Sequence, residues 1–171
     1  MAEQFLTLMA DLDDESQAKM SDLYEKLQEK GFTGVQTSGL PFHISLASYP
    51  LDKEKDVIEL IKKVAGEYSP VPIEISHIGV FAGGKVMFGA PDMNSGLTSL
   101  HEACLMVDSL QEYGWTPHVT IIIDEPEIIG NALPIIGRAF EPFHGRVVRL
   151  HLCAFWPTRE IITVELGKLF P

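Results

Sequence analysis

Apolar positions recur along this chain with the two periods that distinguish strands from helices. Alternation every second residue is typical of strands with one buried face, whereas spacings of three and four are typical of amphipathic helices. Alternating or continuous apolar runs predict strands at 4–10, 43–49, 71–81, 85–90, 117–124, 146–156 and 160–166. Helical spacing predicts helices at 14–30, 52–66, 95–113 and 126–139, the last one broken near Pro134.

The predicted elements repeat in the order strand, helix, strand, helix, strand. "SHIGVF" in the first half aligns with "LHLCAF" in the second, which pairs His77 with His151 and Phe81 with Phe155 at a spacing of 74 positions. "FLTL" before the first helix likewise corresponds to "VMFG" before the third. A repeat of this length indicates a duplicated unit with two lobes related by a pseudo-twofold axis.

The fold class that follows is α/β in the broad sense (α+β). We expect a single domain over residues 1–171, built of two lobes from approximate repeats at 3–81 and 85–156. Each lobe is expected to have its own mixed or antiparallel sheet with helices outside, and a groove is expected between the lobes.

Two stretches, "PFHISLASY" and "TPHVTIIID", carry the same polar motif inside apolar strands. Because residues i and i+2 share one face of a strand, His43 projects with Ser45, and His118 projects with Thr120. The two histidines are 75 positions apart, at equivalent places in the repeat. The same alternation extends the first row to Tyr49, which becomes a candidate substrate contact.

A twofold axis between the lobes brings two imidazoles and two hydroxyls to one point, an arrangement suited to a tetrahedral phosphate. Histidine exchanges protons near neutral pH, so one ring can activate water while the other protonates the leaving oxygen. The hydroxyls of Ser45 and Thr120 can donate hydrogen bonds to the phosphate oxygens as charge develops. This chemistry requires one neutral and one charged histidine, which predicts a bell-shaped dependence of rate on pH. We expect neither a metal nor a cofactor.

Four further histidines lie outside the two motifs, and the motifs themselves have two alternative interpretations. His77 and His151 lack a hydroxyl two residues on and are interpreted as structural, as are His101 and His144. A metal site built on His43 and His118 is a further alternative, but two histidines without a nearby carboxylate or cysteine make a poor site. The remaining alternative is a non-catalytic module that binds a nucleotide or phosphate through the same hydroxyls.

Charge and cysteine content restrict the partners and the compartment. The net charge is −11, from 13 basic and 24 acidic residues, and every arginine lies beyond residue 112. Tight binding of duplex nucleic acid, which needs a basic footprint, is therefore not expected. No apolar run approaches the length of a membrane span, and the first residues do not resemble a signal peptide. With only Cys104 and Cys153, a disulfide framework is excluded, and we expect a cytoplasmic protein.

Two H-x-[ST] motifs about half a chain apart in a duplicated α/β unit resemble the two-histidine (2H) phosphoesterase superfamily, which includes proteins called 2′-5′ RNA ligases or RNA 2′,3′-cyclic phosphodiesterases. The segment "IGVF…KVMFGAP" also resembles the family's stretch between the motifs. The resemblance implies a bilobal fold with His43 and His118 as acid and base and with Ser45 and Thr120 binding phosphate. It further implies metal-independent attack on a cyclic or 2′-5′-linked phosphodiester. A small nucleotide or an RNA end is the expected substrate.

Overall fold

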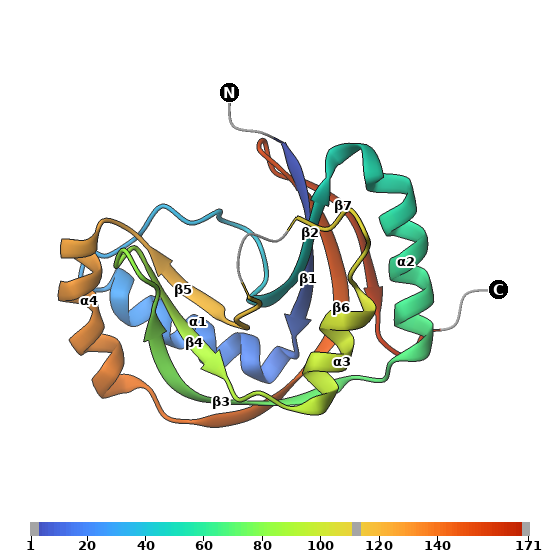
Figure 1. The fold of residues 1–171 in the computed structure, drawn as a ribbon. Helices are drawn as coiled ribbons and strands as arrows, with labels where there is room; N and C mark the ends of the chain where they lie inside the picture. Colours follow the sequence, from blue (N-terminus) through green and yellow to red (C-terminus); the bar gives the residue numbers. More distant parts are fainter. Residues whose placement is uncertain (1–3, 111–113, 169–171) are drawn as a thin grey trace.

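The computed structural model describes residues 4–110 and 114–168. Its helices and strands, shown in Figure 1, are β1 (Phe5–Leu12), α1 (Asp14–Gln28), β2 (His43–Pro50), the short 3-10 turn η1 (Leu51–Lys53), α2 (Glu54–Glu67), β3 (Val71–Val80), β4 (Val86–Pro91), α3 (Ser95–Ala103), β5 (Val119–Ile123), α4 (Pro126–Ala139), β6 (Phe143–Phe155) and β7 (Arg159–Glu165). The predicted α+β class and the twice-repeated order of elements are both found. Within the described residues, no helix combines the length and apolar character needed to cross a membrane.

The strands join into one sheet with the order β2-β1-β6-β3-β4-β5, and β7 pairs with β6 beside this path. All of the pairings are antiparallel. The two separate sheets expected from the sequence are therefore continuous. The connection is β6, whose 13 residues pair with β3 along 143–147 and with β1 along 147–155.

The pairing pattern has the twofold symmetry that the repeat predicts. β1 lies between β2 of its own repeat and β6 of the other, just as β4 lies between β5 of its own repeat and β3 of the other. The last strand of each repeat thus crosses into the opposite lobe. Because β2 and β5 are the two ends of the curved sheet, they face each other at the centre of the molecule and are in contact (Figure 1).

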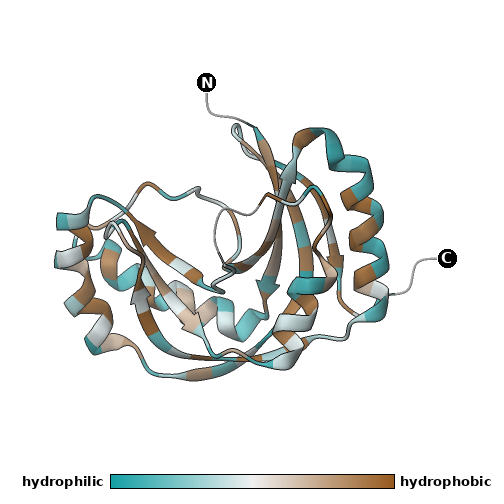
Figure 2. Cartoon of the chain, in the orientation of Figure 1, coloured by the Kyte–Doolittle hydropathy of each residue, from teal (hydrophilic) through white to brown (hydrophobic). Residues whose placement is uncertain are grey.

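The helices cover the outer side of the sheet with the same exchange between repeats. α1 and α4 pack on the lobe that contains β4 and β5, whereas α2 and α3 pack on the lobe that contains β2, β6 and β7 (Figure 1). The strands carry many hydrophobic residues among hydrophilic ones, and helix α2 is hydrophobic toward the sheet and hydrophilic on its outer side (Figure 2). Burial of these apolar surfaces provides the main stabilising free energy of the two lobes.

Two predicted helices differ in the structure. α3 ends at Ala103, well short of 113, because the following residues cover the edge of β2, where the Leu110 N–H donates to the Ser48 carbonyl. Residues 111–113 of the predicted helix lie outside the described residues. α4 continues through Pro134 without a break, so the loss of one backbone hydrogen bond at this proline does not end the helix.

Candidate active site in the central groove

A β-bulge follows the hydroxyl residue of each motif. In the β1–β2 pair, Leu8 opposes Ala47 and Met9 opposes Ser45, which leaves Leu46 as the extra residue. The β4–β5 pair skips Ile121 in the same way, because Met87 opposes Ile122 and Phe88 opposes Thr120. A bulge reverses which face the later residues of a strand occupy. Each motif therefore exposes its histidine and hydroxyl to the groove and then turns its next residues into the core.

This reversal corrects the prediction for Tyr49. Simple alternation placed its ring in the same row as His43 and Ser45, but the bulge at Leu46 moves it to the opposite face. Tyr49 is fully buried, and its hydroxyl donates a hydrogen bond to the Cys104 carbonyl oxygen. It packs in the core and makes no contact with the groove.

The two catalytic candidates are held in the same way. His43 begins β2 and His118 immediately precedes β5. The Nδ1 atom of His43 lies 2.7 Å from the Pro41 carbonyl oxygen, and that of His118 lies 2.8 Å from the Thr116 carbonyl oxygen. A carbonyl only accepts, so Nδ1 carries the proton in both rings. In the neutral form, each Nε2 is then a free acceptor.

Two cavities combine residues of the two motifs crosswise. One cavity, of about 580 Å³, contains His43 together with Thr120, and the other, of about 700 Å³, contains His118 together with Ser45. Each histidine thus shares a cavity with the hydroxyl residue of the opposite lobe, as expected when β2 and β5 face each other across a twofold axis. The structure brings these four residues together as two pairs, and their catalytic and phosphate-binding roles stay predictions.

Burial is the main influence on the charge of both rings. It lowers the pKa of His43 and of His118, because a charged imidazole loses hydration inside the groove. The carbonyl partners act in the opposite direction in both cases, and the Asp11 carboxylate partly offsets the shift at His43. The two rings are also close enough that the charge of His118 lowers the pKa of His43.

Aromatic side chains form walls of the groove that the motif analysis missed. Phe155 lines the cavity of His43, and Phe81 lines the cavity of His118, with its ring perpendicular to the imidazole at a centroid distance of 4.7 Å. These phenylalanines are repeat equivalents, so the alignment of "SHIGVF" with "LHLCAF" already contained the signal. The ring centroid of Phe88 is 5.5 Å from that of His118. The Phe88 ring lies over Gly79, and a Cβ at that position would collide with it.

The segments before and beside the first motif are held by side-chain hydrogen bonds. Gln17 on α1 donates to the carbonyls of Leu12 and Phe42, and its side-chain oxygen accepts from the Phe42 N–H. On the outer edge of β2, Trp115 donates to the Ser45 carbonyl, and Nδ1 of the buried His101 lies 2.7 Å from the Leu46 carbonyl oxygen. The indole and this imidazole stack in parallel at 4.0 Å. His101 therefore has the structural role expected from the sequence.

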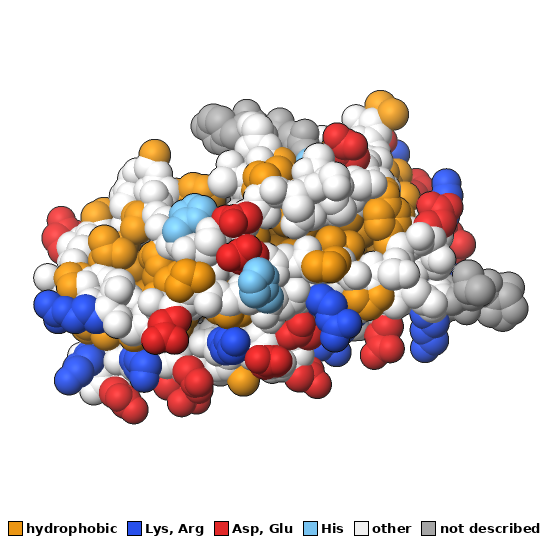
Figure 3. All heavy atoms as spheres, turned by 90° about the horizontal axis from the view of Figure 1, so that it is seen from below, with side chains coloured by type: hydrophobic (Ala, Val, Ile, Leu, Met, Phe, Trp, Pro, Cys, Tyr) orange, Lys and Arg blue, Asp and Glu red, His pale blue; other side chains and the backbone are white. Residues whose placement is uncertain are grey.

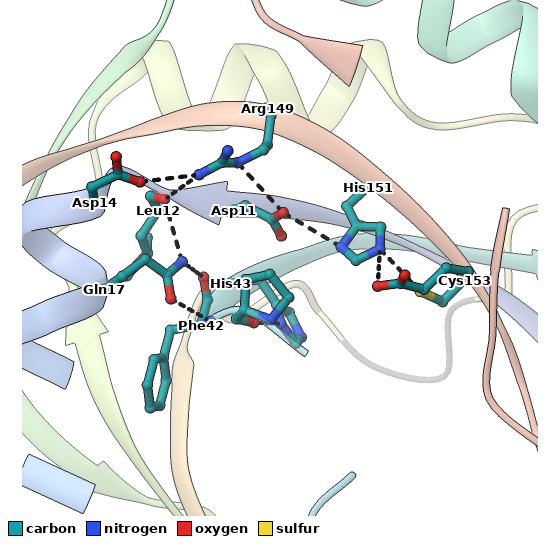
Figure 4. A network of polar contacts seen from close by, with 11 residues as sticks. Asp11, Leu12, Asp14, Gln17, Phe42, His43, Arg149, His151 and Cys153 are labelled. Carbon is teal, nitrogen blue, oxygen red and sulfur yellow. Dashed lines mark hydrogen bonds and ion pairs between the residues drawn. The ribbon is translucent and has the colours of Figure 1, made fainter. Parts of the chain in front are cut away.

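His151 lies outside the two cavities in a network of charged residues, in which His151 and Asp11 are buried and Glu160 and Asp14 are exposed (Figure 4). Its Nδ1 is 3.4 Å from Asp11 Oδ2, and its Nε2 is 3.2 Å from Glu160 Oε1. The nearby Asp11 carboxylate raises the pKa of His151. Arg149 is shared between Asp11 and Asp14, at 3.7 Å from each.

The two cavities of the groove lack charged side chains among the described residues that line them. Basic residues elsewhere on the surface are interspersed with acidic ones, as the face seen in Figure 3 shows. Arg159, which lies near the turn between β6 and β7, is paired with Glu54. The groove therefore offers a phosphate two imidazoles and neutral hydrogen-bond donors, with no lysine or arginine beside them.

Comparisons with known proteins identify the family and the fold. The family model described as the 2′-5′ RNA ligase superfamily matches residues 12–155. No curated protein matches the chain at the level of sequence.

Solved structures share the fold at low sequence identity. Escherichia coli LigT complexed with 3′-AMP superposes with a TM-score of 0.62 and 18% identity, over 96% of this chain and 99% of LigT. The protein TT0787 of Thermus thermophilus superposes with a TM-score of 0.64 and 14% identity, over 95% of this chain and 98% of TT0787. The match of the family model spans most of the chain, including both histidine motifs, and it shows that this chain belongs to the 2′-5′ RNA ligase superfamily.

Proposed function

We propose that this protein is a metal-independent phosphodiesterase that opens a cyclic or 2′-5′-linked nucleotide phosphodiester by acid–base catalysis with His43 and His118. The observation that carries the proposal is the crosswise sharing of the cavities, in which each histidine lies with the hydroxyl residue of the other lobe. The charge of His118 acts on His43, which supports one phosphate site between the two cavities, within reach of both rings.

The mechanism uses the Nε2 atoms as the reacting groups. One neutral imidazole takes a proton from the attacking water, and the other, protonated, gives its proton to the leaving ribose oxygen. The carbonyls of Pro41 and Thr116 hold the Nδ1 protons and so keep both Nε2 atoms aimed away from the backbone. Ser45 and Thr120 donate to the non-bridging oxygens, where negative charge increases in the transition state.

The charge of the groove favours a substrate with a single negative charge. A phosphodiester is a monoanion, which one imidazolium neutralises, and the cavity walls contain no further cation for a second phosphate among the described residues. Their volumes are in the range of small-molecule sites. We therefore propose 2′,3′-cyclic nucleotides and short RNA ends as substrates in preference to long RNA. LigT, whose fold this chain shares, has been crystallised with 3′-AMP and with phosphate.

The experiment that tests the proposal measures hydrolysis of 2′,3′-cyclic nucleotides in the presence of EDTA. We expect turnover by the unmodified protein and a loss of about 10²- to 10⁴-fold in kcat for His43→Ala and for His118→Ala, the usual contribution of a general acid or base. His144→Ala is the matched control, because this histidine is exposed on β6, outside both cavities, and its variant should keep full activity.

The non-catalytic module is the alternative outcome of the same experiment. If the protein binds the cyclic nucleotide without turnover, and His43→Ala and His118→Ala bind it equally well, the protein is a non-catalytic binding module and the enzyme proposal is wrong. Turnover that disappears in EDTA and returns with added metal would contradict the metal-independent mechanism.

A further inference from the structure

Three potential metal ligands outside the groove converge on one point between β6 and β7. His151 Nε2, Cys153 Sγ and a Glu160 carboxylate oxygen all lie within 4.8 Å of one another. His151 and Cys153 are two residues apart and share a face of β6. In the pairing of β6 with β7, Leu152 opposes Ile162 and Cys153 opposes Glu160, so Ile161 is the extra residue of a bulge. This bulge brings Glu160 directly opposite Cys153.

The distances between these atoms resemble those between ligands of a tetrahedral metal ion. Typical bonds from zinc to sulfur, nitrogen and oxygen place a sulfur and a nitrogen ligand about 3.5 Å apart, and a nitrogen and an oxygen ligand about 3.4 Å apart. Here, the separation of Cys153 Sγ and His151 Nε2 is 3.4 Å, and that of His151 Nε2 and Glu160 Oε1 is 3.2 Å. Two of the three separations between the ligand atoms therefore already suit a metal, and the third is within 4.8 Å.

The far side of the imidazole has the partner that metal-bound histidines usually have. His151 Nδ1 faces Asp11 Oδ2 at 3.4 Å across the sheet, as Figure 4 shows, and this orients Nε2 toward Cys153. A carboxylate behind a ligating histidine fixes the ring and its tautomer in metal sites. His151 Nδ1 and Asp11 Oδ1 are both buried, and neither has a hydrogen-bond partner among the described residues.

The other repeat contains the Asp–His pair without the remaining ligands. His77 and Asp92 are the equivalents of His151 and Asp11, and they lie 3.9 Å apart on the surface. At the position of Cys153, this repeat has Gly79, which the Phe88 ring covers. Duplication alone accounts for the Asp–His pair, but it does not account for the addition of a thiol and a second carboxylate in one copy.

We propose that His151, Cys153 and Glu160 bind one divalent transition-metal ion, for which Zn²⁺ fits this mixture of thiolate, imidazole and carboxylate best. Binding displaces the thiol proton of Cys153 to solvent. The fourth ligand is water from the open hollow beside the cluster, which is lined in part by Arg149 and Thr163. Met9 and Phe155 pack around Cys153 and shield the sulfur on the other side.

None of the three metal ligands takes part in the reaction proposed above, although the charges of Asp11 and His151 act on His43. Residues 39–41 line both the groove of His43 and the hollow beside His151. The metal links β6 to β7 and stabilises the fold. The acid, the base and the hydroxyls that donate hydrogen bonds to phosphate all lie in the groove. The proposal changes the expectation of a metal-free protein only at His151, Cys153 and Glu160.

The test is a titration of the reduced, EDTA-treated and desalted protein with Zn²⁺, and with Co²⁺ as an optical probe. We expect one equivalent to bind, a thiolate-to-cobalt charge-transfer band to appear, and the melting temperature to rise with added Zn²⁺. Cys153→Ser should abolish the band, and Glu160→Gln should weaken binding by about 10-fold or more. Glu160 is exposed, so its variant should fold even if a change at Cys153 prevents folding.

Two variants serve as matched controls. His77→Gln alters the equivalent histidine, and Cys104→Ala removes the other thiol, and both should bind Zn²⁺ as the unmodified protein does. Failure of the unmodified protein to bind Zn²⁺ or Co²⁺, or equal binding by Glu160→Gln, would overturn the proposal. Hydrolysis of a cyclic nucleotide in EDTA is measured on the same samples, so that loss of the metal site and loss of the proposed function are recognised separately.

Discussion

At the scale of single residues, the central feature is a pair of histidines that share both their hydrogen bonding and their burial. Each Nδ1 meets the carbonyl two residues before it, and burial lowers the pKa of each ring. The catalytic state needs one ring neutral and one protonated. Two lowered pKa values shift this singly protonated state to the acid side of the ordinary histidine value of 6.5.

The dependence of kcat/KM on pH should therefore be bell-shaped with its maximum below pH 6.5. As the pH rises through the higher of the two pKa values, the acid histidine loses its proton and activity falls. As the pH decreases through the lower one, the base becomes protonated and activity falls again. Initial rates with a 2′,3′-cyclic nucleotide at low substrate concentration report these groups of the free enzyme. A plateau that extends above about pH 8 would contradict the assignment.

Single residues also show which parts of the candidate site could be predicted from the sequence. His43, Ser45, His118 and Thr120 were found because a histidine and a hydroxyl two apart share a strand face. Tyr49 was misplaced by the same rule, since the rule assumes a regular strand. The bulge at Leu46 adds one residue, and apolar Leu46 and Ala47 give no sign of it in the sequence.

At the scale of the elements, the site depends on how the start of β2 is fixed. His43 follows a loop that is tied to α1 by Gln17, which makes three hydrogen bonds to the backbone of Leu12 and Phe42. Gln17 itself lies outside the two cavities of the groove. We regard it as a positioning residue for His43.

Gln17→Ala should lower kcat by about 10- to 100-fold, because a displacement of about 1 Å at a reacting group has an effect of this size. KM should change little, since the walls of the groove remain. Glu25→Ala provides the control, as it alters an exposed residue of the same helix. The measurement is the separate determination of kcat and KM, and an unchanged kcat for Gln17→Ala would remove this role.

The order of elements was predictable, but their pairing was not. Hydrophobic periodicity predicted each strand and most helix bounds. The exchange of β3 and β6 between lobes depends on which strands meet in space, and an antiparallel pattern has no local signal for this choice. The early end of α3 has a similar origin, because residues after Ala103 are used to cover the open edge of β2.

At the scale of the whole molecule, pseudo-symmetry assembles the groove from both repeats. Neither lobe alone contains a histidine together with the hydroxyl residue that shares its cavity. The duplication was visible in the sequence, which is why the gathering of the four residues could be predicted. The additional ligands near His151 were not predicted, because Glu160 reaches Cys153 only through strand pairing and a bulge in β7.

The most direct test of the central claim is a crystal structure of the protein with inorganic phosphate. The account predicts one phosphate at the junction of the two cavities, within hydrogen-bond distance of Nε2 of both His43 and His118 and of the hydroxyls of Ser45 and Thr120. A phosphate bound to only one of these histidines, or an empty groove with phosphate bound elsewhere, would contradict it.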